Sequence, residues 1–64
     1  MKFKDLFAVI EPGTRLVIDY NYEMLQYRTD ELYEDSLFYE SIKDKEVETL
    51  WYSIVYKAQV IKLI

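Results

Sequence analysis

The fold is decided near the end of the chain, by Thr49-Leu50-Trp51-Tyr52-Ser53-Ile54-Val55-Tyr56 and, after Lys57, by Ala58-Gln59-Val60-Ile61-Lys62-Leu63-Ile64. Aromatic and β-branched residues dominate both runs, which predicts two strands joined through a short break. Because strand side chains alternate between two faces, the first strand carries large apolar groups on both. We therefore expect a cover on each face: an N-terminal helix on one, and a second copy or another protein on the other.

The size of the chain limits what else can stabilise it. With 64 residues it forms a single domain, residues 1–64, and such a domain buries only about 60% of the surface of its unfolded chain. The absence of cysteine removes disulfides and thiolate metal sites, and the absence of histidine removes the commonest general base. We expect no cofactor and no bound metal, and stability from an aromatic core and from homo-oligomer formation.

Charge and hydropathy predict the compartment and exclude some partners. No apolar run approaches the roughly 20 residues that cross a bilayer, and the charged opening Met1-Lys2-Phe3-Lys4-Asp5 is unlike a signal peptide. We expect a cytoplasmic protein that does not bind membranes. The net charge of -4 argues against direct nucleic-acid binding, which draws its affinity from basic residues.

The first half of the chain predicts a helix followed by a hairpin. Phe3, Leu6, Phe7 and Ile10 have helical spacing, and the run 11–14, which contains Pro12 and Gly13, ends that helix. Residues 14–20 and 24–28 read as strands joined by a loop at 21–23. A short helix is expected near 30–36, and the structure of 36–46 stays open. The sequence thus predicts an α+β fold in the order α-β-β-(α)-β-β, with a four-stranded, mostly antiparallel sheet.

Acidic residues concentrate in residues 30–48, where eight acids face two lysines, a balance of -6 against +2 elsewhere. Two interpretations stay open: a docking face for a basic protein partner, which could imitate the phosphates of a nucleic acid, or a solvated face that keeps an aromatic domain soluble. The candidate partner-binding residues are Asp30, Glu31, Glu34, Asp35, Glu40, Asp44, Glu46 and Glu48.

Two further groups of residues are candidates for function. Asp19 and Glu23 flank the first hairpin and are weak candidates for catalysis, because two carboxylates can share a divalent cation that activates water. The aromatic residues could stack bases, but the chain lacks the basic groove that normally accompanies such stacking, so we assign them to the core and to self-association. For self-association the candidates are Trp51, Tyr52 and Tyr56.

The opening Met1-Lys2-Phe3-Lys4-Asp5-Leu6, the run Thr14-Arg15-Leu16-Val17-Ile18-Asp19 and the late Lys45-Glu46-Val47 resemble small proteins of phages and prophages of low-GC Gram-positive bacteria. Several proteins of that size and origin inhibit host defence, anti-CRISPR proteins among them, and acidic character is frequent there. The resemblance implies a non-catalytic inhibitor in the host cytoplasm that binds a basic, nucleic-acid-handling protein, such as a CRISPR effector nuclease, through the acidic face. The alternatives are a metal-dependent DNA-nicking protein that uses Asp19 and Glu23, and a structural accessory protein that binds itself.

Overall fold

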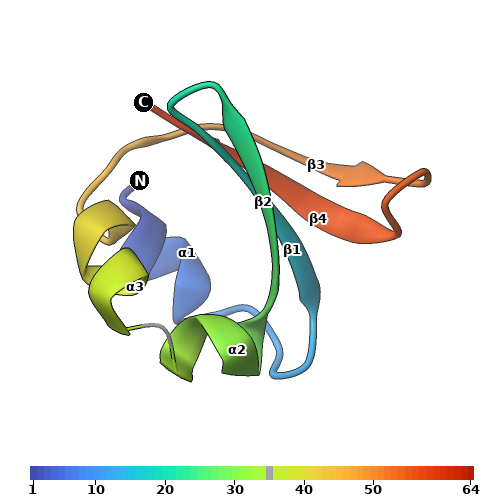
Figure 1. Cartoon of the computed structure of the whole chain (residues 1–64). Helices are drawn as coiled ribbons and strands as arrows, with labels where there is room; N and C mark the ends of the chain where they lie inside the picture. Colours follow the sequence, from blue (N-terminus) through green and yellow to red (C-terminus); the bar gives the residue numbers. More distant parts are fainter. Residues whose placement is uncertain (35) are drawn as a thin grey trace.

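A computed structural model describes residues 1–34 and 36–64, with the side chains of 33–36 outside the described part. The described residues form a sheet that is covered by short helices on one face (Figure 1). In chain order the elements are α1 (Phe3–Phe7), β1 (Arg15–Tyr20), β2 (Glu23–Arg28), α2 (Thr29–Glu34), α3 (Ser36–Ile42), β3 (Val47–Ser53) and β4 (Ala58–Leu63). The α+β fold expected from the sequence is confirmed, and α3 occupies most of the segment that the sequence left open.

The sheet has the order β2-β1-β4-β3. β1 and β2 form one antiparallel hairpin and β3 and β4 form another, while β1 and β4 meet in parallel at the centre. The sheet is therefore mixed, with antiparallel pairing in each hairpin and one parallel junction. The two helices α2 and α3 supply the crossover that such a junction requires.

The main core lies between the helices and the face of the sheet that we call the helix-covered face. Phe3, Leu6 and Phe7 of the predicted helical stripe are buried there, together with residues of β1 and β4. The helix is shorter than predicted: α1 ends at Phe7, and Ile10 lies beyond it, partly buried against the core. In α1, the Phe3 ring lies 5.6 Å from the Phe7 ring, and the Phe7 ring lies 5.4 Å from Tyr39 of α3. The fully or largely buried members of this core are Phe3, Leu6, Phe7, Leu16, Ile18, Leu32, Ile42, Ile61 and Leu63.

The opposite face of the sheet, which we call the open face, has a small core of its own. Val17 of β1 pairs with Val60 of β4, and both are buried together with Ala58. No helix of the described residues covers them (Figure 1). Side chains of the flanking strands must exclude water here, since Trp51 pairs with Val60 from one side and Gln26 pairs with Val17 from the other.

The last hairpin turns earlier than the sequence predicted. The strand was expected to continue to Tyr56, but β3 ends at Ser53 and residues 54–57 form the loop. The buried Ser53 accepts a hydrogen bond at its Oγ from the Tyr56 N–H at 3.1 Å, and Lys57 has a left-handed φ of 53°. Such a hydroxyl-to-backbone bond competes with strand pairing and favours a turn.

The first hairpin carries a strained residue that offers a test. Its two-residue turn places both Asn21 (φ 55°) and Tyr22 (φ 63°) in the left-handed region. Asparagine adopts this region readily, whereas tyrosine adopts it only with backbone strain. Since glycine adopts this conformation freely, although it adds entropy to the unfolded chain, we expect Tyr22→Gly to stabilise the domain by roughly 0.5–1 kcal/mol. Urea unfolding measures this directly, and a lower free energy of unfolding in the variant would contradict the turn geometry.

Candidate interaction surface

The strongest candidate for a functional surface is the hairpin arm, which we define as β3, β4 and the loop 54–57. In Figure 1 the arm extends away from the helices, and β3 is an edge strand. Large apolar side chains along it are exposed: Leu50 by 49%, Trp51 by 51%, Tyr52 by 56%, Ile54 by 83% and Val55 by 89%. Exposed apolar residues gathered on one hairpin make it a candidate interaction site.

The register of the sheet explains why both faces of β3 are exposed. Leu50 and Tyr52 pair with Ile61 and Gln59, so they lie on the helix-covered side. Leu50 borders a pocket that Leu6 of α1 also lines, yet about half of the Leu50 side chain and of the Tyr52 side chain stays exposed. Trp51 pairs with Val60 and therefore lies on the open face. The sequence predicted that each face of this strand is covered. Within the described chain the helices cover β4 but neither face of β3 between residues 48 and 52.

Ile54 and Val55, which we call the apolar tip, lie at the end of the arm in the loop. Turns are normally made of Gly, Pro, Asn, Asp or Ser, because these residues suit turn geometry and water. Two β-branched apolar residues in a fully exposed turn gain nothing from folding the monomer. Their exposure makes the apolar tip a candidate contact surface.

β3 is an edge strand, and among the described residues no strand pairs with its side facing away from β4, which we call the free edge. Ile64 donates its N–H to the Glu46 carbonyl at 3.1 Å, and in an antiparallel pair every second residue bonds to the same neighbour. Counted from Ile64 along β4, the residues that bond to β3 are Lys62, Val60 and Ala58. A register shift between Val47 and Thr49 makes Thr49, Trp51 and Ser53 their partners, so the backbone groups of Trp51 and Ser53 point toward β4 and those of Leu50 and Tyr52 toward the free edge. The start of this edge is covered, since Val47 donates to the Met1 carbonyl at 2.8 Å.

The predicted acidic residues lie mostly on the surface of the helix layer and the start of β3, and most have a cation beside them. Glu31 is exposed and has no ion-pair partner among the described residues. Asp35 lies outside the described residues, as does the side chain of Glu34. The ion pairs join Asp30 to Arg28 (3.2 Å), Glu40 to Lys43 (2.8 Å), Asp44 to Lys4 (3.3 Å) and Lys2 (3.9 Å), Glu46 to the N-terminal ammonium (3.1 Å), and Glu48 to Lys62 (3.7 Å).

These ion pairs change the proton affinities of two exposed groups. The hydrogen bond from Lys4 lowers the pKa of Asp44 below its ordinary value of 3.8, and the charges of Lys4, Lys2 and Lys43 act in the same direction. The hydrogen bond to Glu40, with the charge of that carboxylate, raises the pKa of Lys43 above 10.5. The local field of the acidic segment is therefore partly neutralised by its own lysines.

The lowered pKa of Asp44 can be tested through Lys4. A depressed carboxyl pKa stabilises the fold above the unfolded pKa of about 3.8, and this contribution is lost as the pH falls through the folded pKa. We expect Lys4→Gln to raise the pKa of Asp44 toward 3.8, measured by carboxyl-carbon NMR titration. Lys62→Gln, which removes the partner of Glu48, should leave it unchanged. An equal Asp44 pKa in wild type and Lys4→Gln would contradict the assignment.

Asp19 and Glu23 are not brought together. In the β1–β2 register Asp19 pairs with Met24, while Glu23 pairs with Tyr20. Paired residues share a face and successive residues alternate, so the two carboxylates lie on opposite faces of the sheet. Within residues 1–34 and 36–64 no group of three or more His, Asp or Glu side chains could hold a metal ion. The geometry therefore gives no support to a shared cation at this hairpin.

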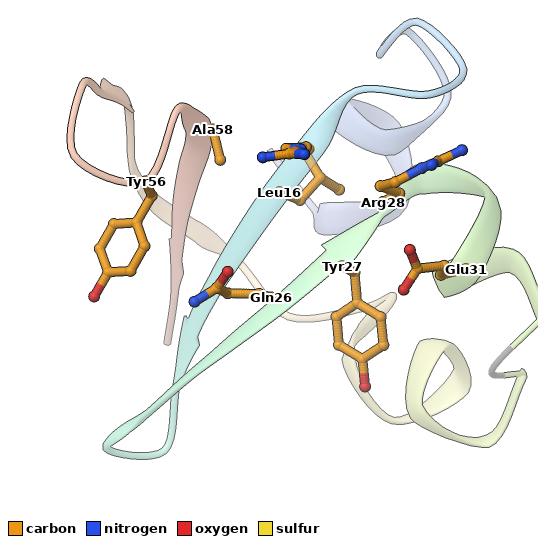
Figure 2. A pocket seen from close by; sticks show the side chains of 8 residues that line it. Leu16, Gln26, Tyr27, Arg28, Glu31, Tyr56 and Ala58 are labelled. Atoms are coloured by element: carbon orange, nitrogen blue, oxygen red, sulfur yellow. The ribbon is translucent and has the colours of Figure 1, made fainter.

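A pocket of about 360 Å³ at the β1–β2 end of the open face contains both arginines of the chain. Arg15 and Arg28 are direct partners across the two strands. Arg28 is held by Asp30, and the carboxylate of Glu31 lines the same pocket. The labelled polar groups of Gln26, Arg28 and Tyr56 are spread along the pocket in Figure 2 and do not converge. The pocket is therefore poorly suited to an anion.

The remaining aromatic candidates divide between core and surface. Tyr27 stacks on Phe38 with ring centroids 5.2 Å apart, and Lys45 lies 5.7 Å above the ring of Tyr20. Both tyrosines are partly buried against the main core, so they are structural. Trp51 and Tyr52 are exposed as a self-association site requires, and Tyr56 lies in the loop. Sequence reasoning missed the apolar tip because it placed Ile54 and Val55 within a strand.

No protein-family model, no curated protein sequence and no solved structure matches the chain significantly. Of the helices that the described residues form, none has the length and apolar character needed to span a membrane.

Proposed function

We propose that this chain is a non-catalytic binding protein that docks on another protein through the apolar tip of its hairpin arm. The observation that carries the proposal is the exposure of Ile54 (83%) and Val55 (89%) in a turn. Deep insertion of such residues into a pocket would remove them from water, and each fully buried side chain of this type contributes roughly 1.5–3 kcal/mol. Because Ile54 and Val55 lie at the narrow end of the hairpin arm, they suit a groove on the partner better than a flat surface.

The charge of the chain defines the class of partner. The net charge is -4, and the exposed acids of the helices include Asp30 and Glu31 of α2 and Glu40 of α3. Complementary charge accelerates association and excludes like-charged proteins. A basic, nucleic-acid-handling protein fits this charge, and the resemblance to phage inhibitors of host defence, anti-CRISPR proteins included, points to the same class. In this proposal the tip supplies the affinity and the carboxylates supply long-range steering.

Affinity capture with matched variants tests the proposal. The immobilised chain is incubated with lysate of a low-GC Gram-positive bacterium at 0.1 M salt, beside the double variant Ile54→Asp/Val55→Asp. Tyr22→Asp, at the fully exposed tip of the other hairpin, is the matched control. We expect at least one basic protein to bind wild type and the control but not the double variant.

The salt dependence of binding distinguishes steering by the carboxylates from affinity supplied by the apolar tip. The Debye length falls from about 10 Å at 0.1 M to about 3 Å at 1 M, so steering by carboxylates should weaken while burial of the tip persists. We expect the association rate of the captured protein to fall with salt and its dissociation rate to change little. Identical capture by wild type and the double variant would overturn the role of the tip.

A further inference from the structure

We propose that the free edge of β3 pairs antiparallel with the free edge of a second copy, across a two-fold axis at Trp51. The result is one continuous sheet through both copies. This inference goes beyond the proposed function, because it names a separate occupant of the hairpin arm. It uses a different part of the arm, because the apolar tip lies beyond the paired segment.

The backbone of β3 is suited to this pairing. Leu50 and Tyr52 direct their N–H and C=O groups to the free edge, as the register with β4 requires. Natural proteins usually protect an exposed edge with charges, proline or a covering segment. Here the N-terminal segment covers only the start, through the bridge between Lys2 and Glu46. From residue 49 to residue 56 the chain contains no charge and no proline.

The two outward-facing residues determine the register. Antiparallel hydrogen-bonded pairs form only between residues whose backbone groups face the partner strand. We place Leu50 of one copy opposite Tyr52 of the other, and the two-fold axis then places Tyr52 of the first copy opposite Leu50 of the second. In this register the N–H and C=O groups of Leu50 and Tyr52 in both copies are all hydrogen-bonded. Trp51 then meets Trp51 of the second copy as a non-hydrogen-bonded pair, in which side chains approach most closely, with Cα atoms about 4.5 Å apart.

This register also joins apolar groups on both faces. Leu50 and Tyr52 of the two copies lie side by side on the helix-covered side, and the two Trp51 rings lie together on the open face. Cross-strand pairs of aromatic residues stabilise antiparallel sheets. The buried Val17, Ala58 and Val60 on the open face would be further shielded by this indole pair.

Charge favours a second copy in antiparallel orientation. Glu48 is the nearest acid and is held by Lys62 at 3.7 Å. Antiparallel pairing moves the two Glu48 side chains to opposite ends of the joint, whereas a parallel arrangement would place them together. A chain of net charge -4 can approach its own copy most easily through an uncharged segment, and β3 with its loop supplies that segment.

The available area sets the expected strength. A standard interface removes about 800 Å² from each partner, less than a fifth of the 4550 Å² surface of this chain. Half of an aromatic side chain, as at Trp51 and Tyr52, is roughly 100 Å². The exposed side chains of the paired segment supply less than this standard area, so we expect a weak interface with a dissociation constant on the order of micromolar.

Sedimentation velocity of the full chain, over about 5 to 500 µM, tests this pairing. We expect wild type to shift from the monomer mass of 7.8 kDa to twice that mass. Trp51→Lys, which places two cations at the axis, should stay monomeric, and Val55→Lys at the tip should dimerise like wild type. Tyr52→Pro removes an outward N–H without removing a bond to β4, and should raise the dissociation constant at least tenfold. Circular dichroism establishes that each variant is folded.

The outcomes separate this inference from the proposed function. A folded wild type that stays monomeric at 500 µM, or a folded Trp51→Lys variant that dimerises equally, overturns the edge pairing even if tip-dependent capture succeeds. Dimerisation that Trp51→Lys and Tyr52→Pro abolish supports the edge pairing even if capture by the tip fails.

Discussion

Replacing Phe3 by alanine is expected to leave the chain largely unfolded. Phe3 is fully buried, its ring lies 5.6 Å from Phe7 and 6.3 Å from Tyr39, and its N–H bonds to the Lys45 carbonyl at 2.9 Å. Truncation of a buried phenylalanine costs about 3–5 kcal/mol. A domain of this length has a total stability of roughly 3–10 kcal/mol, so the loss is comparable with the whole.

Val9→Ala is the matched control, because Val9 follows the same helix but is largely exposed. We expect its free energy of unfolding to stay within about 0.5 kcal/mol of wild type. Urea unfolding followed by circular dichroism gives both values. If Phe3→Ala and Val9→Ala unfolded at the same urea concentration, the packing of α1 on the sheet would be contradicted.

Val60→Asp is expected to be almost as damaging, although Val60 lies on the face without helices. Val60 is buried between Val17 of β1 and Trp51 of β3. An unpaired carboxylate placed there loses its hydration without gaining a partner, which costs several kcal/mol. We therefore expect a thermal midpoint lower by at least 15 °C, since about 1 kcal/mol moves the midpoint of so small a domain by 4–8 °C.

Gln26→Asp introduces the same charge on the same face at an exposed position, two strands away. We expect it to shift the midpoint by only a few degrees. Scanning calorimetry of the two variants decides the matter. Similar midpoints would mean that the Val17, Ala58 and Val60 cluster is accessible to water and that the open face has no core.

Local patterns were sufficient to predict most elements of this fold, but not α3 or the end of β3 at Ser53. The helical spacing of Phe3, Leu6 and Phe7 and the alternation in each strand identified the same residues that the structure buries or pairs. The parallel contact of β1 with β4 was not predictable in this way. It joins Leu16 to Gln59, far apart in sequence, and depends on how two hairpins pack once the helices are placed.

The candidate site was predictable in part, for a similar reason. The two-sided apolar character of β3 indicated an interaction surface at Trp51 and Tyr52, and the structure leaves both half exposed. The apolar tip could not be predicted, because Ile54 and Val55 are residue types that favour strands. They lie outside β3 only because the chain turns after Ser53, whose hydroxyl accepts a hydrogen bond from the Tyr56 N–H. The ion pairs of Asp44 and Glu46 depend on the N-terminal segment lying beside them, which the charge pattern did not reveal.

Residue-resolved amide hydrogen exchange of β3 in a dilution series tests the hairpin arm as a contact surface most directly. Trp51 bonds toward β4 and should be protected at every concentration, whereas Leu50 and Tyr52 face the free edge. We expect the amides of Leu50 and Tyr52 to become protected as the concentration rises through the micromolar range. Exchange of these two amides as fast as that of Tyr22 at every concentration, with Trp51 still protected, would contradict the account.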